Sequence, residues 1–142
     1  MFTEDLIKSI VDKLAESVYP ILAGDAIRCF PNEICGFVFE DYTVQPAFNS
    51  IKTLNHPALN TTNSFMIDAH AWACAEENKK NAFAIYHSHT NGCGDFSDFD
   101  KNTLTLDDVF YIVVGIKDRK LNEIKIHWYE NKVLKSYTAS LI

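Results

Sequence analysis

Two apolar runs constrain the fold of this chain more than any other feature. Residues 82–87 and 109–116 are almost continuous in apolar side chains, which is typical of strands covered on both faces. Covering both faces of a sheet requires helices, and the segments around these runs supply them. The sequence therefore predicts an α/β (α+β) fold, in which a mixed β-sheet is flanked by helices.

The surrounding segments predict the remaining helices and strands. Apolar residues recur at helical spacing from Thr3 to about Pro20, and a second short helix is expected to end at Pro31. Further predicted elements are strands over 35–39, from 42 onward and over 64–68, helices over 69–80 and 97–106, and a hairpin over 123–137. Residues 49–63 are rich in Asn and Thr, so they predict a loop that is a candidate for substrate contact.

The first strand of the C-terminal hairpin is predicted to have one wet face. Lys125, His127 and Tyr129 alternate with apolar residues along it. Because successive side chains of a strand point to opposite faces, these three share one side. We therefore expect this face, including His127, to contact water.

Length and charge indicate one ordinary globular domain. The 142 residues suit a single domain, with N-terminal helices over 3–30, a central part over 31–116 and the hairpin over 123–137. The net charge of −6 argues against a nucleic-acid-binding module, which would carry a basic patch. The expected partner is therefore not a nucleic acid.

Cysteine spacing and hydropathy indicate the cellular compartment. The four cysteines (Cys29, Cys35, Cys74 and Cys93) form no C-x-x-C pair, so neither a zinc knuckle nor a thioredoxin-like motif is predicted. No secretory leader is visible, and no apolar run approaches the length of a membrane span. We expect a cytoplasmic protein with reduced thiols and no membrane partner.

The stretch from His87 to Asp100 carries the candidate chemistry. His87 and His89 follow the first apolar run and, two residues apart on a strand, point to the same side. A Gly-rich turn, Ser97 and Asp100 come next, and Asp100 completes an N/N/O ligand set if the loop folds back. Three protein ligands with an open fourth position are typical of a catalytic zinc site.

A zinc site of this kind needs a proton carrier as well. Bound zinc lowers the pKa of a water to about 7, but another group must take the proton and return it to the leaving amine. The H-E-x-x-H motif, which would supply a Glu, is absent. Glu33, just before the strand over 35–39, is the candidate base. Ser97 is a candidate hydrogen-bond donor to the oxyanion or the water.

Structural alternatives exist for each of these residues. Ser97 and Asp100 also fit a capping box that starts a helix, and we do not expect one Asp100 oxygen both to cap and to ligate. Glu33 could be a solvated acid, and the histidines could end a surface strand. Cys93 could turn onto the zinc and occlude the site, or be only a small loop residue.

The spacing of these residues resembles a known family of zinc proteases. His87-Ser88-His89, Ser97 and Asp100 follow the H-x-H-x7-S-x2-D pattern of the JAMM metalloproteases, the MPN+ (JAB) domains. Residues 31–36 resemble the family's P-x-E-x-C-G element, and the likeness spans residues 31–115. Thr90 and Phe96 stand where the family usually has Pro, which puts the rigidity of the loop in question.

The resemblance implies a fold, a cofactor and residue roles. It implies a JAB/MPN-like domain with a three-layer arrangement like that of cytidine deaminases. It also implies one zinc per chain held by His87, His89 and Asp100, with Glu33 as acid/base and Ser97 as helper. Family members hydrolyse peptide or isopeptide bonds, commonly beside the C-terminus of a ubiquitin-like protein.

Within that family, the chain looks most like the bacterial and phage tail-assembly branch. This implies a protein or peptide substrate, either ubiquitin-like or a tail-tip protein, in the host cytoplasm or the virion. Such tail proteins often carry a second, cell-wall-cleaving domain, and we expect none within these residues, so that either the gene is split or this is a stand-alone member. The alternative function is a catalytically silent scaffold with the same fold. A zinc nucleobase deaminase would need H-x-E and P-C-x-x-C, and neither occurs.

Overall fold

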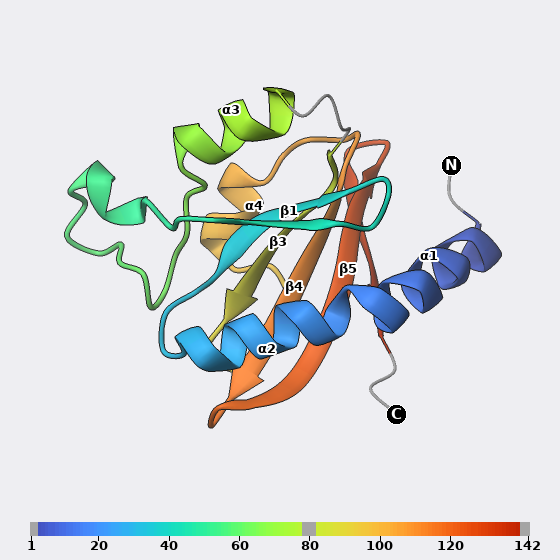
Figure 1. The fold of residues 1–142 in the computed structure, drawn as a ribbon, viewed down its shortest axis with the longest axis horizontal. Coiled ribbons are helices and arrows are strands. Elements are labelled where there is room, and N and C mark those ends of the chain that lie inside the picture. Colours follow the sequence, from blue (N-terminus) through green and yellow to red (C-terminus); the bar gives the residue numbers. More distant parts are fainter. Residues whose placement is uncertain (1–2, 78–81, 140–142) are drawn as a thin grey trace.

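A computed structural model describes residues 3–77 and 82–139 of the chain (Figure 1). The helices are α1 (Glu4–Ser17), α2 (Tyr19–Cys29), the 3-10 helix η1 (Ile51–Leu54), α3 (Ala69–Glu77) and α4 (Asp98–Thr103). The strands are β1 (Cys35–Phe39), β2 (Val44–Ala47), β3 (Ala82–His89), β4 (Phe110–Lys117), β5 (Lys120–Glu130) and β6 (Val133–Thr138). They form a six-stranded sheet in the order β2-β1-β3-β4-β5-β6. β3 and β4 pair in parallel and the other neighbours are antiparallel, so the predicted mixed sheet is confirmed.

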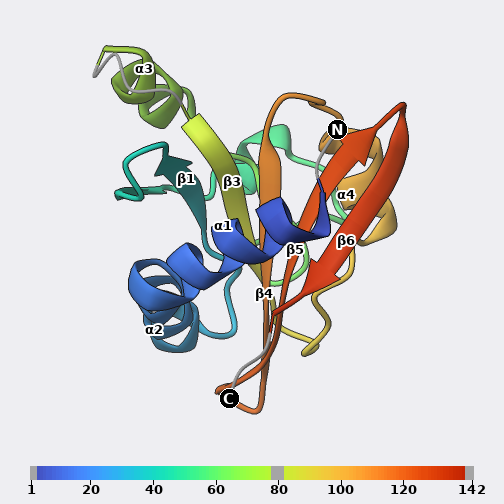
Figure 2. The same cartoon turned by 90° about the vertical axis from the view of Figure 1, so that its right-hand side faces the viewer.

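The sheet lies between two layers that bury different sets of side chains. Ala84 and Tyr86 of β3 belong to the apolar cluster that includes α1 and α2. Ile85, from the same strand, belongs to the cluster that includes Ala71 and Ala75 of α3. Figure 2 shows α4 on the opposite side of the strands from α1 and α2. This alternation follows from the two-residue period of a strand, and the three-layer arrangement is confirmed.

Polar side chains cap the N-termini of α1 and α3. The Thr3 hydroxyl accepts a hydrogen bond from Leu6 N at the start of α1. Asp68 Oδ2 accepts from Ala71 N at the start of α3, while its Oδ1 accepts from Phe48 N. The helix predicted over 69–80 is described as far as Glu77, and the rest of that prediction lies outside the described residues.

The strand predicted over 64–68 is wrong. This segment forms only an isolated bridge between Asn49 and Ile67. The Asn49 side chain instead forms hydrogen bonds to main-chain groups that a neighbouring strand would otherwise satisfy. Its Oδ1 accepts from Met66 N, and its Nδ2 donates to Ser64 O. The predicted loop before it also contains the short helix η1. Pro46 does lie in a strand, but β2 is at the edge of the sheet, where its missing N–H is tolerated.

The two C-terminal hairpins turn on residues with positive φ. Asp118 and Arg119 join β4 to β5, and Asn131 and Lys132 join β5 to β6. Two such residues in succession form the type I′ turn that matches the twist of the flanking strands. The connection between β4 and β5 is therefore only Asp118 and Arg119. No helix among the described residues is long and apolar enough to cross a bilayer.

The prediction that the polar face of β5 contacts water is wrong at His127, which is only 2% exposed. Its Nε2 donates to Gly94 O over 2.8 Å, and its ring lies 4.5 Å from that of Phe96. The loop between β3 and α4 therefore covers this face. The polar side chains of β5 alternate as expected, but they hold a loop instead of facing only solvent.

Candidate metal centre

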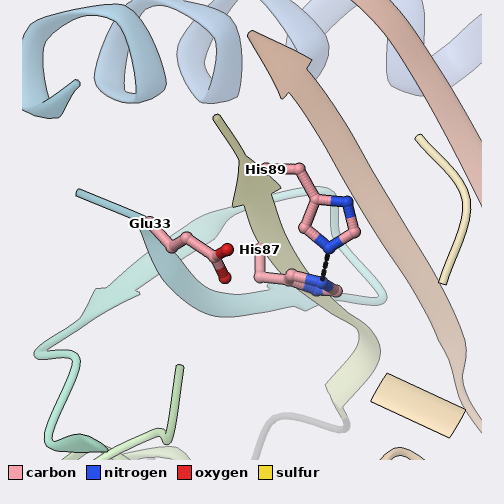
Figure 3. Close-up of side chains that lie close together, drawn as sticks. All are labelled: Glu33, His87 and His89. Carbon is pink, nitrogen blue, oxygen red and sulfur yellow. Dashed lines mark hydrogen bonds between the residues drawn. The ribbon is translucent and has the colours of Figure 1, made fainter. Parts of the chain in front are cut away.

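The two histidines of β3 lie where the strand period predicts. His87 and His89 are buried, and their Nε2 atoms lie 3.1 Å apart. Figure 3 shows the two rings directed toward one another, with Glu33 beside them. The prediction that both side chains point to one side is confirmed, and the alternative of a surface strand end is excluded.

Asp100 reaches the same point from the first turn of α4. Its Oδ2 lies 3.1 Å from His87 Nε2 and 2.9 Å from His89 Nε2. The same oxygen accepts from Ser97 N, and Ser97 Oγ accepts from Asp100 N, which completes a capping box. Because a carboxylate oxygen has two lone pairs, one can cap while the other faces the histidines. One Asp100 oxygen thus caps α4 and faces the histidines, and its service as a metal ligand stays a prediction.

These three atoms suit a metal ion. Tetrahedral zinc with bonds of about 2.0–2.1 Å places its ligand atoms roughly 3.3 Å apart, close to the separations of 2.9–3.1 Å. His89 Nδ1 donates to Cys93 O over 2.9 Å, which leaves the Nε2 lone pair of a neutral ring for the cluster. His87 Nδ1 is buried without a partner among the described residues. The donor set therefore fits a divalent cation.

Glu33 joins the histidines because of strand register. β1 and β3 run antiparallel with Cys35 opposite His87. Continuing this register, Glu33, two residues before Cys35, comes opposite His89, two residues after His87. The donor atoms of Glu33, His87 and His89 all lie within 4.8 Å of one another. At 6% exposure Glu33 is not a solvated acid, so that alternative is wrong. Glu33, His87 and His89 form a buried cluster that could hold a metal. The donor atoms of His87, His89 and Asp100 lie closer together than those of this cluster.

Two polar residues that the sequence did not single out hold Glu33 in place. Ser88 Oγ accepts from Ile34 N over 2.8 Å, and Ser88 N donates to Ile34 O. On the other side, Asn49 Nδ2 donates to Glu33 O, and Glu33 N donates to Thr61 O. Ser88 stands between the histidines, but its part as an anchor depends on a pairing with the distant β1 segment. No signal in the sequence identifies either anchor.

Burial and neighbouring charges shift the titration of the cluster. Burial raises the pKa of Glu33 to about 8; His89 opposes this shift and Asp100 adds to it. Burial alone would raise the pKa of Asp100, but the two imidazoles and Ser97 N–H hold it well below its ordinary value. Desolvation lowers the pKa of His87. Desolvation also acts to lower the pKa of His89, but the hydrogen bond to Asp100 and its charge outweigh desolvation, so the pKa of His89 is raised.

The raised pKa of Glu33 predicts a pH-dependent stability of metal-free protein. Between about pH 5 and pH 8 folded Glu33 keeps a proton that the unfolded chain releases, so its contribution to stability falls as pH rises. Glu33→Gln removes this effect. In chelator, we expect the unfolding free energy of Glu33→Gln minus that of wild type to grow across this range in urea titrations. A constant difference would contradict the assignment; Glu16→Gln, exposed on α1, is the control.

Side chains of β5 fix the loop that links the histidines to α4. Asn122 Nδ2 donates to Gly92 O, and Glu123 Oε2 accepts from Gly94 N, both over 2.7 Å. Lys125 pairs with Asp95 over 2.6 Å, and His127 donates to Gly94 O. We call Asn122, Glu123 and His127, which bond to the main chain of this loop, the loop anchors. They hold in place the loop whose carbonyl at Cys93 orients His89.

The loop between β3 and α4 makes close contacts although it lacks the two prolines that are usual in the family. Gly92 adopts φ +84, and its carbonyl passes so close to Gly115 that a Cβ there would lie 2.4 Å from the oxygen. Thr90 Oγ1 donates to Thr62 O, and the Phe96 ring packs on Tyr111 and His127. The absence of the two prolines therefore does not leave this loop without contacts.

Cys93 contributes its main chain to the centre. Its Sγ lies 3.4 Å from Asp95 N and 3.5 Å from Asp95 Oδ2, whereas its carbonyl accepts from His89. The cluster among the described residues that could hold a metal does not include its thiol. The structure thus supports the interpretation of Cys93 as a loop residue.

His127→Phe is expected to weaken metal binding without touching a ligand. Phenylalanine keeps the ring but removes the donor to the buried Gly94 carbonyl, so the loop and its bond to His89 loosen. Loss of a group bonded directly to a ligand typically costs about 10–100-fold in metal affinity, and because His127 bonds to the residue after Cys93, we expect a loss at the lower end, about tenfold. Competition against a chromophoric chelator measures this. Lys125→Met, which removes a pair with the 60% exposed Asp95 side chain, is the control and should change affinity little. Unchanged affinity in His127→Phe would refute the coupling.

A polar cleft of about 260 Å³ opens beside the cluster. It is lined by Glu33, Thr62, Asn63, His89, Thr90, Asn91 and Ser97. Thr62 and Asn63 belong to the loop expected to contact substrate, and that contact stays a prediction. Glu33 and Ser97, the two candidate catalytic residues, both face this space.

The fold and the buried donor cluster define a three-layer α/β domain with a candidate metal centre. The model of the prokaryotic homologues of the JAB domain matches residues 15–128, and the chain belongs to this family. The predicted membership in the JAB family is thereby confirmed. No curated protein sequence matches the chain significantly.

Two solved structures share the fold. The solution structure of a protein from Desulfitobacterium hafniense covers 88% of each chain at 17% identity, with a TM-score of 0.63. That of a protein from Salinibacter ruber covers 88% of this chain and 86% of its own at 16% identity, with a TM-score of 0.55. At these identities the likeness establishes the fold alone.

Proposed function

We propose that this chain is a zinc-dependent peptidase or isopeptidase that cleaves a protein or peptide substrate in the cleft beside Glu33. One observation carries the proposal: a buried carboxyl group lies next to three donor atoms that converge within 3.1 Å. A scaffold has no need of a buried acid beside such a cluster, because burying it costs free energy.

In this proposal His87, His89 and Asp100 would hold the ion. When bound, zinc supplies a Lewis acid and acidifies a coordinated water. Glu33, whose donor atom lies within 4.8 Å of those of both histidines, would receive the proton of the attacking water. It then delivers this proton to the nitrogen of the leaving amine as the C–N bond breaks.

The environment of Glu33 suits both halves of this task. Burial favours its protonated form, which suits delivery of a proton to a basic nitrogen, whereas the charge of a bound cation would favour the carboxylate that first accepts the proton of water. Ser97 lines the same cleft, and Oγ can donate its own proton to the oxygen of the scissile carbonyl while it accepts from Asp100 N. Ubiquitin-like and phage tail-assembly proteins are the candidate substrates.

Chelation and metal return test the proposal. Protein purified without chelator is incubated with fluorescently labelled, denatured casein, and cleavage is followed before and after treatment with 1,10-phenanthroline. We expect cleavage that disappears with the chelator and returns with one equivalent of zinc. Cleavage that survives complete removal of metal would contradict the proposal, as would purified protein with neither bound metal nor cleavage after zinc is added.

A further inference from the structure

An apolar pocket adjoins the candidate metal centre, and the chemistry proposed above does not use it. It encloses about 330 Å³ between η1, α3 and α4, and none of its lining residues is charged. Its floor includes the buried side chains of Phe65, Ile85 and Tyr111. The rim includes Leu54, Trp72 and Leu106, which are 52%, 41% and 46% exposed. We call this space the apolar pocket.

The apolar pocket and the polar cleft share two segments of the chain. Asn63 lines the cleft and Phe65 lines the pocket; likewise, Ser97 lines the cleft and Phe99 the pocket. The Phe65 ring also stacks on His87, with centroids 4.2 Å apart. Two residues span at most about 7 Å of chain, so lining residues of the two spaces lie within the length of two or three residues of an extended peptide.

The lining defines the chemistry of the occupant. A charged side chain would lose its hydration there without finding a partner, because no lining residue carries a charge. An apolar side chain would cover Leu54, Trp72 and Leu106, which otherwise face water together, and apolar surface gathered in this way marks binding sites. The volume is large enough for a bulky side chain.

We propose that the apolar pocket binds a bulky aliphatic or aromatic side chain of the polypeptide substrate, two or three residues from the cleaved bond. This inference rests on the proposed function and adds the substrate class: sequences with such a residue beside the scissile bond. Pockets of this kind discriminate side chains by about tenfold or more in kcat/KM.

Binding is tested apart from hydrolysis. The probes are acetyl-Gly-Phe-Gly-amide and acetyl-Gly-Ser-Gly-amide, added to Glu33→Gln protein with isotope-labelled isoleucine methyl groups. Ile51, Ile67 and Ile85 line the pocket and report its occupation. We expect the Phe peptide, and not the Ser peptide, to shift these methyl signals. Equal shifts with both peptides, or none with either, would overturn the proposal.

A matched pair of variants locates the effect. Leu106→Asn removes an apolar rim residue that is 46% exposed, whereas Leu6→Asn makes the same change on α1 at 45% exposure. We expect Leu106→Asn to weaken binding of the Phe peptide about fivefold, as the loss of part of a buried leucine predicts. Leu6→Asn should leave binding unchanged. Equal effects of the two variants would overturn the assignment of the pocket.

Hydrolysis gives an independent readout. Bonds cleaved in denatured casein are identified by mass spectrometry for wild type and both variants. We expect Leu, Ile, Phe and Met to be enriched within three residues of the cut, and the enrichment to fall only in Leu106→Asn. Methyl shifts without any cleavage would contradict the proposed function and support the pocket. Cleavage with neither enrichment nor shifts would overturn the pocket and leave the proposed function standing.

Discussion

Glu33→Gln protein is expected to bind zinc as wild type does and to lose hydrolysis. Glutamine fills the same space beside His89 but can neither take up nor deliver a proton. Removing a general acid/base typically lowers the rate by about 10²–10⁴-fold. The zinc content of the purified variant and its cleavage of labelled casein are measured side by side.

The retained metal makes this variant decisive. The three atoms within 3.1 Å of one another belong to His87, His89 and Asp100, so the substitution leaves that set intact. Glu16→Gln, on the surface of α1, controls for the loss of one negative charge. Hydrolysis at the wild-type rate with Glu33 replaced would contradict its role as proton carrier. Loss of zinc from Glu33→Gln would make Glu33 a ligand.

Asp100→Asn is expected to abolish tight metal binding while α4 still begins at Ser97. Asparagine keeps an oxygen that can accept from Ser97 N, but it lacks the charge that stabilises a cation. Ser97→Ala does the reverse, because it removes the acceptor of Asp100 N and leaves the carboxylate. It should cost about 1 kcal/mol of unfolding free energy and less in metal affinity than Asp100→Asn.

Calorimetric zinc titration and urea unfolding of both variants separate the two roles of Asp100. Asp98→Asn, which changes an exposed acid on the same helix, is the control for charge. If Asp100→Asn bound zinc as tightly as wild type, the carboxylate would serve only as a cap. If Ser97→Ala lost zinc as completely as Asp100→Asn, the cap would be necessary to hold the ligand.

Local patterns in the sequence predict most of the fold and the components of the site. The run over 82–87 and the period of two place His87 and His89 on one face, and Ser-x-x-Asp starts α4. These features depend on neighbouring residues, so the sequence displays them directly. The position of Glu33 beside them follows from the family resemblance, and its physical cause is the register of β1 against β3.

The interactions that the sequence does not predict are long-range and polar. Asn49 replaces a strand partner for residues 64–66, so the pattern that favours a strand there leads to a different outcome. Ser88 couples β3 to the segment of Glu33, and His127 is buried by a loop more than 30 positions earlier in the chain. Each depends on a tertiary contact that composition and periodicity do not encode.

The central claim is that His87, His89 and Asp100 hold a metal ion beside Glu33. X-ray absorption at the zinc edge of protein loaded with one equivalent tests it most directly. The structure predicts two imidazole nitrogens and oxygen ligands at about 2.0–2.2 Å, with no sulfur, and loss of the imidazole signal in a His87→Ala, His89→Ala double variant. A spectrum with sulfur at about 2.3 Å, or one unchanged in the double variant, would contradict the claim.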